Sequence, residues 1–363
     1  MVNLASIIEI VETKEAIEQI DSCTECDACL DVCQTYEITQ QDVFGPMHRL
    51  HTARNILQGE EINSEGIDSI YNCMKCGRCN VVCPMDIDIA GVIRKAQIDL
   101  VRREVGPLES PNRVMAGIQK LDNAFNGDPA KKWGWLPEEF PKRESDTLLY
   151  IGCSASFAYP QAARTSYLLL KKLGVDFMLL KDESCCGYFY YYVGREDLAR
   201  EKFEQNVEKF KRQGIRRIIT ICAGCYHSFK NWYPELLGRM DFEIVHISQL
   251  LPGLLKERSG DLRKDGREMT YHDPCGLGRL GGGIYGEPRE ALRLCGVNLV
   301  EVEQSRELSS CCGAMIINNF RDMAAKVAGN FLDKVNTPDI MTSCTSCLFG
   351  LNYGNKKTGK NKK

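Results

Sequence analysis

The spacing of apolar residues changes along the chain near residue 147. Before that point they recur at helical intervals, as in residues 1–20, 47–58 and 92–101, which predicts amphipathic helices. The apolar face of the first stretch consists of Ile7, Ile10, Val11, Ile17 and Ile20. That of the last consists of Val92, Ile93, Ala96, Leu100 and Val101. Beyond residue 147, short apolar runs alternate with helical stretches, which is typical of parallel sheets covered by helices.

The rear part of the chain is an internal repeat. A span of 72 positions from Cys153 to Cys225 is matched by 72 positions from Cys275 to Cys347, and such periodicity indicates duplicated units. The expected strands are 148–151, 176–180, 217–221, 269–272, 298–302 and 340–342, and the expected long helices are 196–212 and 321–335. We therefore expect two repeated α/β domains with cysteines in the loops after strands, where open sheets build their sites.

These patterns predict an α+β multidomain fold. It consists of an N-terminal all-helical unit, a proline-containing linker with a short helix, two repeated α/β domains and a lysine-rich tail. The expected boundaries are 1–105 for the helical unit, 106–146 for the linker, 147–255 and 256–350 for the two domains, and 351–363 for the tail.

Composition limits the class of protein. The net charge of -3 gives no reason to expect nucleic acid or a membrane surface as a partner. No apolar run is long enough to cross a membrane, and residues 1–20 lack the basic region and apolar core of an export signal. We therefore expect a cytoplasmic chain with reduced thiols. Its 19 cysteines are then better explained by metal ligation than by disulfides.

Eight cysteines form two runs with the spacing C-x2-C-x2-C-x3-C, the ligand pattern of bacterial-type [4Fe-4S] clusters. The first run is Cys23, Cys26, Cys29 and Cys33, and the second is Cys73, Cys76, Cys79 and Cys83. In this pattern the fourth cysteine of each run completes the other cluster, so we expect Cys83 to join the first run and Cys33 the second. Zinc is the alternative, although it prefers two separated cysteine pairs. Fully ligated clusters of this kind carry electrons and bind no substrate.

Ten further cysteines form two sets of five. The first set is Cys153, Cys185, Cys186, Cys222 and Cys225, and the second set is Cys275, Cys311, Cys312, Cys344 and Cys347. Adjacent cysteines make poor disulfides and do not share one small tetrahedral ion without strain, but they can bind neighbouring irons. Five thiolates exceed the four of a cubane, which indicates a larger or asymmetric cluster. The remaining Cys295 is expected in the core as a small apolar residue.

The two sets, C-x31-CCG-x34-CxxC and C-x35-CCG-x30-CxxC, resemble the cysteine-rich CCG domain of heterodisulfide reductases and of the related thiol:fumarate reductase. The front unit resembles the helical ferredoxin that these reductases carry as a separate chain. Over about residues 21–350, the order of units is similar to the heterodisulfide reductase D-subunit type, in which the two are fused. The resemblance implies two [4Fe-4S] cubane clusters in front and a non-cubane [4Fe-4S] cluster on each set of five. It also implies that the non-cubane clusters face each other across the site of disulfide cleavage.

The function implied by this resemblance is that of a heterodisulfide-reductase-like iron–sulfur oxidoreductase of anaerobic metabolism. It would perform two-electron chemistry on a small thiol/disulfide substrate. Because the sequence shows neither a membrane span nor a flavin motif, we expect a membrane cytochrome b-type or flavoprotein redox partner, which would hold the chain at the membrane periphery. Two alternatives stay open. One is an electron-transfer subunit of a flavin-linked 2-hydroxyacid or glycerol-3-phosphate dehydrogenase, and the other is a non-catalytic redox-sensing cluster protein.

Few other residues are candidates for chemistry. His272, just before Cys275, can donate a proton to a product thiolate or can simply be a turn residue bonded to the backbone. His227 has the same two interpretations. Residues 188–192 are aromatic and follow the first Cys-Cys-Gly; we expect most of them in the core and one or two beneath an apolar thiol chain. Arg195 and Arg279 are candidates to meet a substrate anion.

One motif suggests a different ligand. Residues 276–281 match G-x-G-x-x-G after a strand, the pattern of a dinucleotide site. The next helix is expected near Pro288, too late to pack on the third glycine as that site requires. We therefore expect a loop around a cluster here, with a nicotinamide or flavin site as the alternative.

Overall fold

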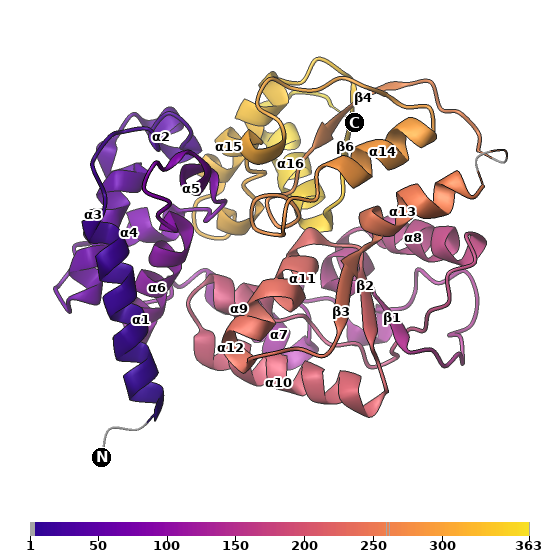
Figure 1. Ribbon diagram of the computed structural model, residues 1–363, viewed down its shortest axis with the longest axis horizontal. Coiled ribbons are helices and arrows are strands. Elements are labelled where there is room, and N and C mark those ends of the chain that lie inside the picture. The colour runs from indigo at the N-terminus through magenta and orange to yellow at the C-terminus, as the bar shows by residue number, and fades with distance from the viewer. Residues whose placement is uncertain (1–3, 259, 261, 363) are drawn as a thin grey trace.

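The computed structural model describes residues 4–258, 260 and 262–362, with side chains described from residue 11 onward. A helical unit at the N-terminus lies beside two small parallel sheets, each flanked by helices (Figure 1). The expected α+β multidomain architecture is confirmed.

The front unit is built from helices around one apolar core. They are α1 (Leu4–Asp21), α2 (Gln34–Thr39), η1 (Asp42–Phe44), α3 (Pro46–Leu57), α4 (Ser64–Asn72), α5 (Arg78–Val82) and α6 (Ile89–Arg102). The Asn63 side chain accepts a hydrogen bond from Gly66 N at the start of α4, and Asp88 accepts one from Gly91 N at the start of α6, because the first backbone N–H groups of a helix need acceptors.

The apolar faces predicted for this unit are only partly in its core. On α6, Val92, Ile93, Ala96 and Leu100 are buried. On α1, Ile20 is buried but Val11 is 49% exposed, while the side chains of Ile7 and Ile10 lie outside the described ones. The end of α1 therefore packs on α3 and α6, and its earlier turns contribute less to the core than the pattern predicts.

The segment expected as a linker contains α7 (Pro111–Leu121) and the short helix η2 (Pro129–Lys131). Met115 and Ile118 of α7 belong to the same buried cluster as the first sheet. Trp135 is also buried, and its ring packs edge-on against Tyr167 at 5.9 Å between centroids. From α7 to Phe140 the segment therefore packs against the first α/β domain, whereas Leu108 packs against the front unit.

The first α/β domain holds a parallel sheet of order β1-β2-β3. The strands are β1 (Thr147–Tyr150), β2 (Arg217–Thr220) and β3 (Glu243–His246). The helices are η3 (Ser154–Ala158), α8 (Pro160–Lys172), α9 (Tyr188–Tyr192), α10 (Glu196–Arg212), α11 (Ala223–His227), η4 (Ser228–Trp232), α12 (Tyr233–Leu237) and α13 (Ile247–Lys256). β1 is buried at every position, as expected for a strand covered on both faces.

The second α/β domain holds a parallel sheet of order β5-β4-β6. Its strands are β4 (Glu268–His272), β5 (Asn298–Leu299) and β6 (Asp339–Thr342). Its helices are α14 (Gly286–Leu294), η6 (Arg306–Leu308), η7 (Ala314–Ile316), α15 (Arg321–Asp333) and α16 (Thr345–Thr358). As predicted, helices follow strands in both domains. The expected position of the cysteines after strands is found for the first and the last two cysteines of each set, whereas Cys185 and Cys186 follow no strand and lie in the loop before α9.

Three local expectations were wrong. Residues 176–180 form no strand; Met178 alone makes a bridge to β1, through bonds to Leu149 N and Thr147 O at 2.9 Å each. β5 has two residues where five were expected. The residues of β3 were missed because the repeat pattern has no counterpart for them. In addition, α16 continues through residues 351–358 of the expected tail, with Leu351 and Gly354 buried.

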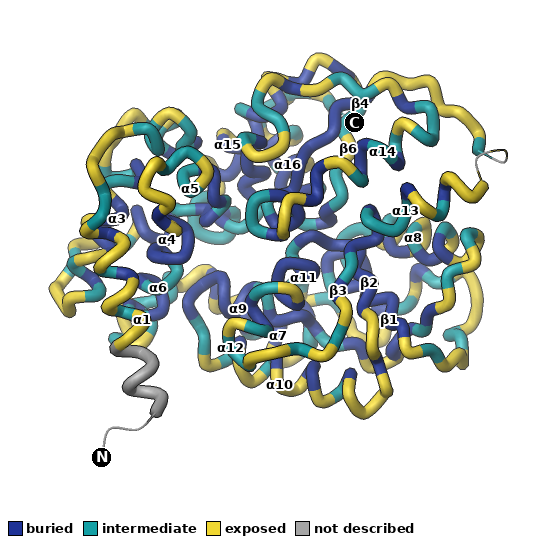
Figure 2. The backbone as a smooth tube through the Cα atoms, viewed as in Figure 1, coloured by how far each residue is buried: buried dark blue, intermediate teal, exposed yellow. Residues whose placement is uncertain are grey.

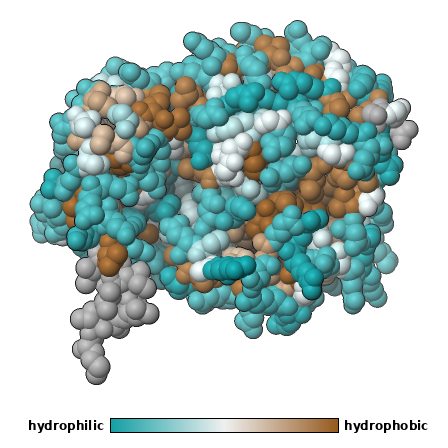
Figure 3. Space-filling model, in the orientation of Figure 1, coloured by the Kyte–Doolittle hydropathy of each residue, from teal (hydrophilic) through white to brown (hydrophobic). Residues whose placement is uncertain are grey.

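The front unit contacts the second α/β domain through α2 against α15 and α5 against η6. In Figure 1 it lies to the left, with α2 and α5 toward the domain that holds α15. The two α/β domains meet through α13 against α14 and through α16 against α11 and η3. Buried and intermediate residues predominate where the two α/β domains meet (Figure 2), while the face seen in Figure 3 is mostly polar with scattered apolar patches.

Candidate functional site

Two small apolar cavities in the front unit are each lined by four thiols. Residues from both cysteine runs contribute to each cavity. One cavity is lined by the group that we call the outer tetrad, which consists of Cys23, Cys26, Cys29 and Cys83. The other is lined by the inner tetrad, which consists of Cys33, Cys73, Cys76 and Cys79. This is the crossed grouping that the spacing predicts, and four soft thiolate donors in an apolar pocket suit a [4Fe-4S] cluster. Among the described side chains, no three or more His, Cys, Asp or Glu are placed to hold a single metal ion.

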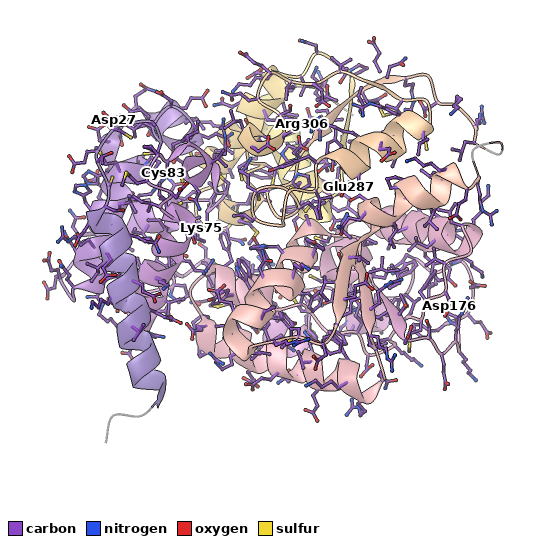
Figure 4. The ribbon with its side chains drawn as sticks, viewed as in Figure 1. Asp27, Lys75, Cys83, Asp176, Glu287 and Arg306 are labelled. Atoms are coloured by element: carbon purple, nitrogen blue, oxygen red, sulfur yellow. The ribbon has the colours of Figure 1, made fainter. Side chains whose placement is uncertain are left out.

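The two tetrads differ in exposure and in the charges around them. Cys26 of the outer tetrad is exposed. The inner tetrad lies against two buried cations, Arg49 and Lys75, and Arg49 Nη1 lies 3.7 Å from Cys33 Sγ. Burial raises the pKa of the Cys73 thiol, while these two cations lower it. In Figure 4, Lys75 lies toward the α/β domains and Asp27 toward the outside of the front unit.

The first set of thiols surrounds the floor of a cavity of about 650 Å³. Its members come from three loops, which follow β1, precede α9 and follow β2. All five line the cavity, namely Cys153, Cys185, Cys186, Cys222 and Cys225. Within the set, Cys185 and Cys225 hydrogen-bond to Cys186 and so lower the pKa of its thiol. The set is therefore a contiguous group of buried sulfurs.

The second set is likewise contiguous. Cys312 hydrogen-bonds to Cys311 and to Cys347, and Cys344 hydrogen-bonds to Cys347. Burial, together with the nearby Cys312 and Cys76, raises the pKa of Cys275 to about 12. The two sets meet where Cys222 Sγ lies 4.0 Å from Cys344 Sγ. The structure thus brings all ten predicted thiols into one buried region, and their role as cluster ligands stays a prediction.

Glycines allow the chain to turn sharply at these thiols. Gly187 and Gly313, which follow the adjacent cysteine pairs, have φ of +73° and +72°, a region that is strained for other residues. A Cβ on Gly313 would lie 2.7 Å from Ala324 O. A Cβ on Gly187 would lie 2.9 Å from Phe203 Cε1, so both positions require glycine for backbone conformation and for packing.

A buried carboxylate, which the sequence analysis did not single out, positions the first set. Glu183 accepts hydrogen bonds from Ile151 N at 2.8 Å and Gly152 N at 3.0 Å, just before Cys153. Lys132 from the linker pairs with it at 3.1 Å. In the sequence, Glu183 is a single acidic residue near the first Cys-Cys-Gly motif, and nothing in that pattern distinguishes a buried carboxylate from a surface one.

A second buried ion pair holds the loop of Cys275. Arg289 of α14 is fully buried and bonds both oxygens of Asp273 at 2.6 and 2.7 Å. It also bonds Glu301 at 2.6 and 2.8 Å. A buried charge is tolerated when it is paired and hydrogen-bonded, as this guanidinium is by two carboxylates.

The cavity wall combines three parts of the chain. The linker contributes Arg113, Val114 and Phe125; the first domain contributes Tyr188 and Phe189; the second contributes Ala314, Met315, Arg321, Ser346 and Phe349. Apolar walls with a few polar groups are typical of small-molecule sites. Of the aromatic run, Tyr188 and Phe189 reach this cavity, and the three tyrosines after them are buried away from it.

The other candidate residues lie elsewhere. His272 is buried, with Nε2 3.1 Å from Ser310 O, and its imidazole does not line the cavity. His227 bonds Asn231 and lies beside Tyr188. Arg195 pairs with Asp197. Arg279 donates to Cys76 O at 2.8 Å and to Ser309 O at 2.8 Å, so it joins the inner tetrad to the second domain.

The glycine motif at 276–281 forms a tight loop. Gly281 packs so closely on Gly276 that a Cβ would lie 2.2 Å from its carbonyl oxygen. The helix α14 begins five residues after the third glycine. Leu280 of this loop lies against Gly77 of the front unit. The loop therefore packs against the inner tetrad, and in this described part of the chain no helix N-terminus sits where a pyrophosphate would need it.

Comparison with known proteins agrees with this layout. The model of the "Cysteine-rich domain" matches residues 147–230 and 269–352, and that of the "4Fe-4S dicluster domain" matches residues 19–87. The D-subunit of the dihydromethanophenazine:CoB–CoM heterodisulfide reductase of Methanosarcina mazei is 32% identical over 76% of this chain and 70% of its own length. The chain belongs to the D-subunit family of heterodisulfide reductases.

Other relatives show how broadly the family extends. The corresponding protein of Methanosarcina barkeri is 31% identical over 68% of this chain and 62% of its own length. The EtfAB:quinone oxidoreductase of Syntrophomonas wolfei is 32% identical over 69% of this chain. The chain spans 36% of the length of that oxidoreductase. These members share an iron–sulfur oxidoreductase layout, so this chain is an iron–sulfur protein of the oxidoreductase class. Among the described residues, none of its helices has the length and apolarity to cross a bilayer.

Proposed function

We propose that this chain is the catalytic iron–sulfur component of a complex that interconverts a small disulfide and two thiols. The reaction balances as R–S–S–R′ + 2 e⁻ + 2 H⁺ → R–SH + R′–SH. The observation that carries the proposal is a cavity of about 650 Å³ whose lining combines the five thiols of the first set with side chains of the linker and of the second domain.

The cofactors that we propose follow from how the thiols are grouped. The outer and inner tetrads would each hold a [4Fe-4S] cubane, and each set of five would hold a non-cubane [4Fe-4S] cluster. Thiolate-bound clusters of this kind supply single electrons at potentials set by their surroundings. The chain's own residues would hold the substrate in a cavity whose lining mixes apolar side chains with polar and charged ones, among them Arg113, Arg321 and Ser346.

The redox partner would dock at the exposed side of the front unit. Cys26 is exposed there, and the neighbouring Val81 and Met85 are 45% and 44% exposed. Exposed apolar side chains beside an electron-carrying site are typical of a docking surface. The partner expected from the sequence is a membrane cytochrome b-type protein or a flavoprotein. Such a partner would keep a cytoplasmic chain at the membrane periphery.

A relay role is the second candidate, and the EtfAB:quinone oxidoreductase relative favours it. In that case the chain would pass electrons between a flavoprotein and an acceptor without binding a thiol. The two proposed functions require the same cluster ligands and differ in whether the cavity binds a thiol.

The test is anaerobic titration of the reconstituted full chain with 6-mercaptohexanol, followed by electron paramagnetic resonance. Iron analysis should first give about sixteen irons per chain if all four ligand sets are filled, against about eight for the front unit alone. Catalytic function predicts a new, saturable signal when the oxidised protein binds thiol. A full iron content with no thiol-dependent signal would instead establish the relay role.

A further inference from the structure

Gln34, the residue after Cys33, reaches from the front unit into the second α/β domain. It is the first residue of α2, which lies against α15 (Figure 1). Gln34 is only 2% exposed, and both ends of its amide are bonded. Its Oε1 accepts a hydrogen bond from Cys311 N at 2.6 Å, and its Nε2 donates one to Val327 O at 3.3 Å. Because Cys33 belongs to the inner tetrad and Cys311 to the second set, one side chain connects the two groups of thiols.

The bond to Cys311 satisfies a buried backbone group. Cys311 is buried, and among the described residues no acceptor other than Gln34 bonds its N–H group. A buried N–H group without an acceptor is costly. Ile38, one turn after Gln34, packs against the apolar cluster that contains Cys311 and Val327, so water is a poor substitute for the amide. The bond therefore fixes the position of α2 relative to the loop of Cys311.

A second side chain bridges the same two groups from the opposite direction. Arg279 lies four residues after Cys275 of the second set. It donates to Cys76 O of the inner tetrad and to Ser309 O, at 2.8 Å each. Cys76 also packs against the apolar cluster of Cys311. The loops of Cys275 and Cys311 are thus both tied to the inner tetrad.

The first α/β domain contacts the inner tetrad in a different way. Tyr192 of α9 donates from its phenol to Cys73 O at 3.3 Å, and its ring centroid lies 3.7 Å from Lys75 Nζ. Tyr192 is six residues beyond Cys186, so this contact involves neither a thiol of the first set nor its backbone. In the described part of the chain, a front-unit side chain bonds the backbone of a rear thiol residue only at Cys311.

We infer that Gln34 is the positioning residue for electron transfer between the inner tetrad and the second set. It holds Cys311 at a fixed separation from Cys33, and that separation sets the rate of transfer. One electron at a time leaves the inner tetrad and reduces the second set, and the redox partner at the front unit replaces it. Loss of a residue that orients metal ligands typically costs roughly ten- to hundredfold in affinity or activity. The inference rests on the cofactors proposed above, which iron content tests independently.

The test uses the reconstituted full chain, reduced with a viologen and frozen at successive times for electron paramagnetic resonance. It has two readouts, both taken per loaded chain. One is the rate at which the second set is reduced after the inner tetrad, and the other is the magnetic splitting between the two reduced sites, which falls steeply with their distance. Gln34→Leu should slow the transfer roughly tenfold or more and weaken the splitting. Gln34→Asn, one methylene shorter, loses the bond to Cys311 and should do the same; it keeps a polar group where the leucine variant loses iron.

Two control variants separate this role from a general loosening of the units. Gln304→Leu removes a hydrogen bond that Arg78 Nη2 donates at 3.0 Å, which joins the same two units away from Cys311. Tyr192→Phe removes the phenol bond to Cys73 O and keeps the ring beneath Lys75. Both variants should behave as the parent does.

The inference is overturned by a parental rate and splitting in the loaded Gln34 variants. Equal slowing in Gln304→Leu would overturn it too, because any loosening of the interface would then suffice. Slowing in Tyr192→Phe would show instead that electrons pass through the first domain. A parent chain with about eight irons overturns the proposed cofactors themselves, and neither readout depends on a thiol substrate.

Discussion

Two glycines with positive φ show what a side chain would cost at such a position. Gly313 has φ of +72° and is also packed against Ala324 O. Gly214 has a similar φ of +67°, but nothing lies within 4 Å of the position of its missing Cβ. A side chain at Gly214 would therefore cost only the unfavourable backbone conformation, whereas one at Gly313 would also clash with a neighbouring atom.

We expect Gly214→Ala to destabilise the fold by about 1–2 kcal/mol, the usual cost of a left-handed backbone for an L-residue. Gly313→Ala should cost clearly more, because its methyl group meets a backbone oxygen that cannot move without shifting α15. Chemical denaturation of the iron-free protein measures both. Equal losses of stability would show that the contact with Ala324 is relieved without cost.

Glu183 illustrates a residue whose importance depends on its burial. We expect Glu183→Gln to destabilise the protein by about 3–5 kcal/mol, because it leaves the charge of Lys132 buried without a partner and weakens the bonds that hold residues 151 and 152. The same change at Glu138, whose pair with Lys171 is exposed, should have little effect.

Thermal denaturation compares the two variants, and iron analysis adds a second readout. Glu183→Gln should also lower the iron bound by the first set, since Cys153 follows directly after the loop. Similar melting temperatures for the two variants would contradict this role for Glu183.

At the scale of secondary-structure elements, α14 is tied to the loop of Cys275 by a buried ion pair. Arg289, in the middle of α14, bonds both oxygens of Asp273. The loop continues directly from β4, so the position of Cys275 depends on this pair.

We expect Arg289→Met to cost about 3–5 kcal/mol in the free energy of unfolding, because Asp273 and Glu301 then lose their shared cation. Urea denaturation measures this loss. The matched change Arg267→Met removes an exposed pair with Asp265 and should be close to neutral. If Arg289→Met is as stable as Arg267→Met, the pair does not hold the loop.

At the scale of the whole molecule, the exposed Cys26 belongs to the outer tetrad of the front unit, while the cavity is lined by the linker and the two α/β domains. Met85 is exposed beside the outer tetrad, whereas Leu168, which is 40% exposed, lies on α8 of the first domain. The two side chains are similar in size and exposure, so they form a matched pair for testing where electrons enter.

We expect Met85→Glu to slow reduction of the bound clusters by the physiological donor at least tenfold, because it puts a charge into the apolar contact. Reduction by a small viologen, which needs no docking surface, should be unchanged. Leu168→Glu should leave both rates as they are. Stopped-flow absorbance measures the rates, and equal slowing by both variants would contradict electron entry at Met85.

Much of the fold was predictable from the sequence because periodicity and cysteine spacing are local signals. The repeat of 72 positions predicted two similar parallel sheets. The spacing of the cysteines predicted that Cys83 groups with the first three cysteines of the first run and Cys33 with those of the second. The sequence did not reveal that residues 176–180 make only a single bridge instead of a strand. Whether an apolar segment pairs along its whole length depends on how close the fold brings it to β1. Glu183 and Arg289 were missed for a related reason: a charged residue in sequence does not reveal that it is buried.

The sequence by itself determined which residues can bind iron, since thiol spacing within a run is a property of consecutive residues. Only the tertiary structure decided how the thiol groups are ordered and which of them reaches a cavity, because those depend on contacts between residues far apart in the chain. The repeat makes the two sets of five equal in sequence. The packing of the front unit against the second domain makes their surroundings different in space.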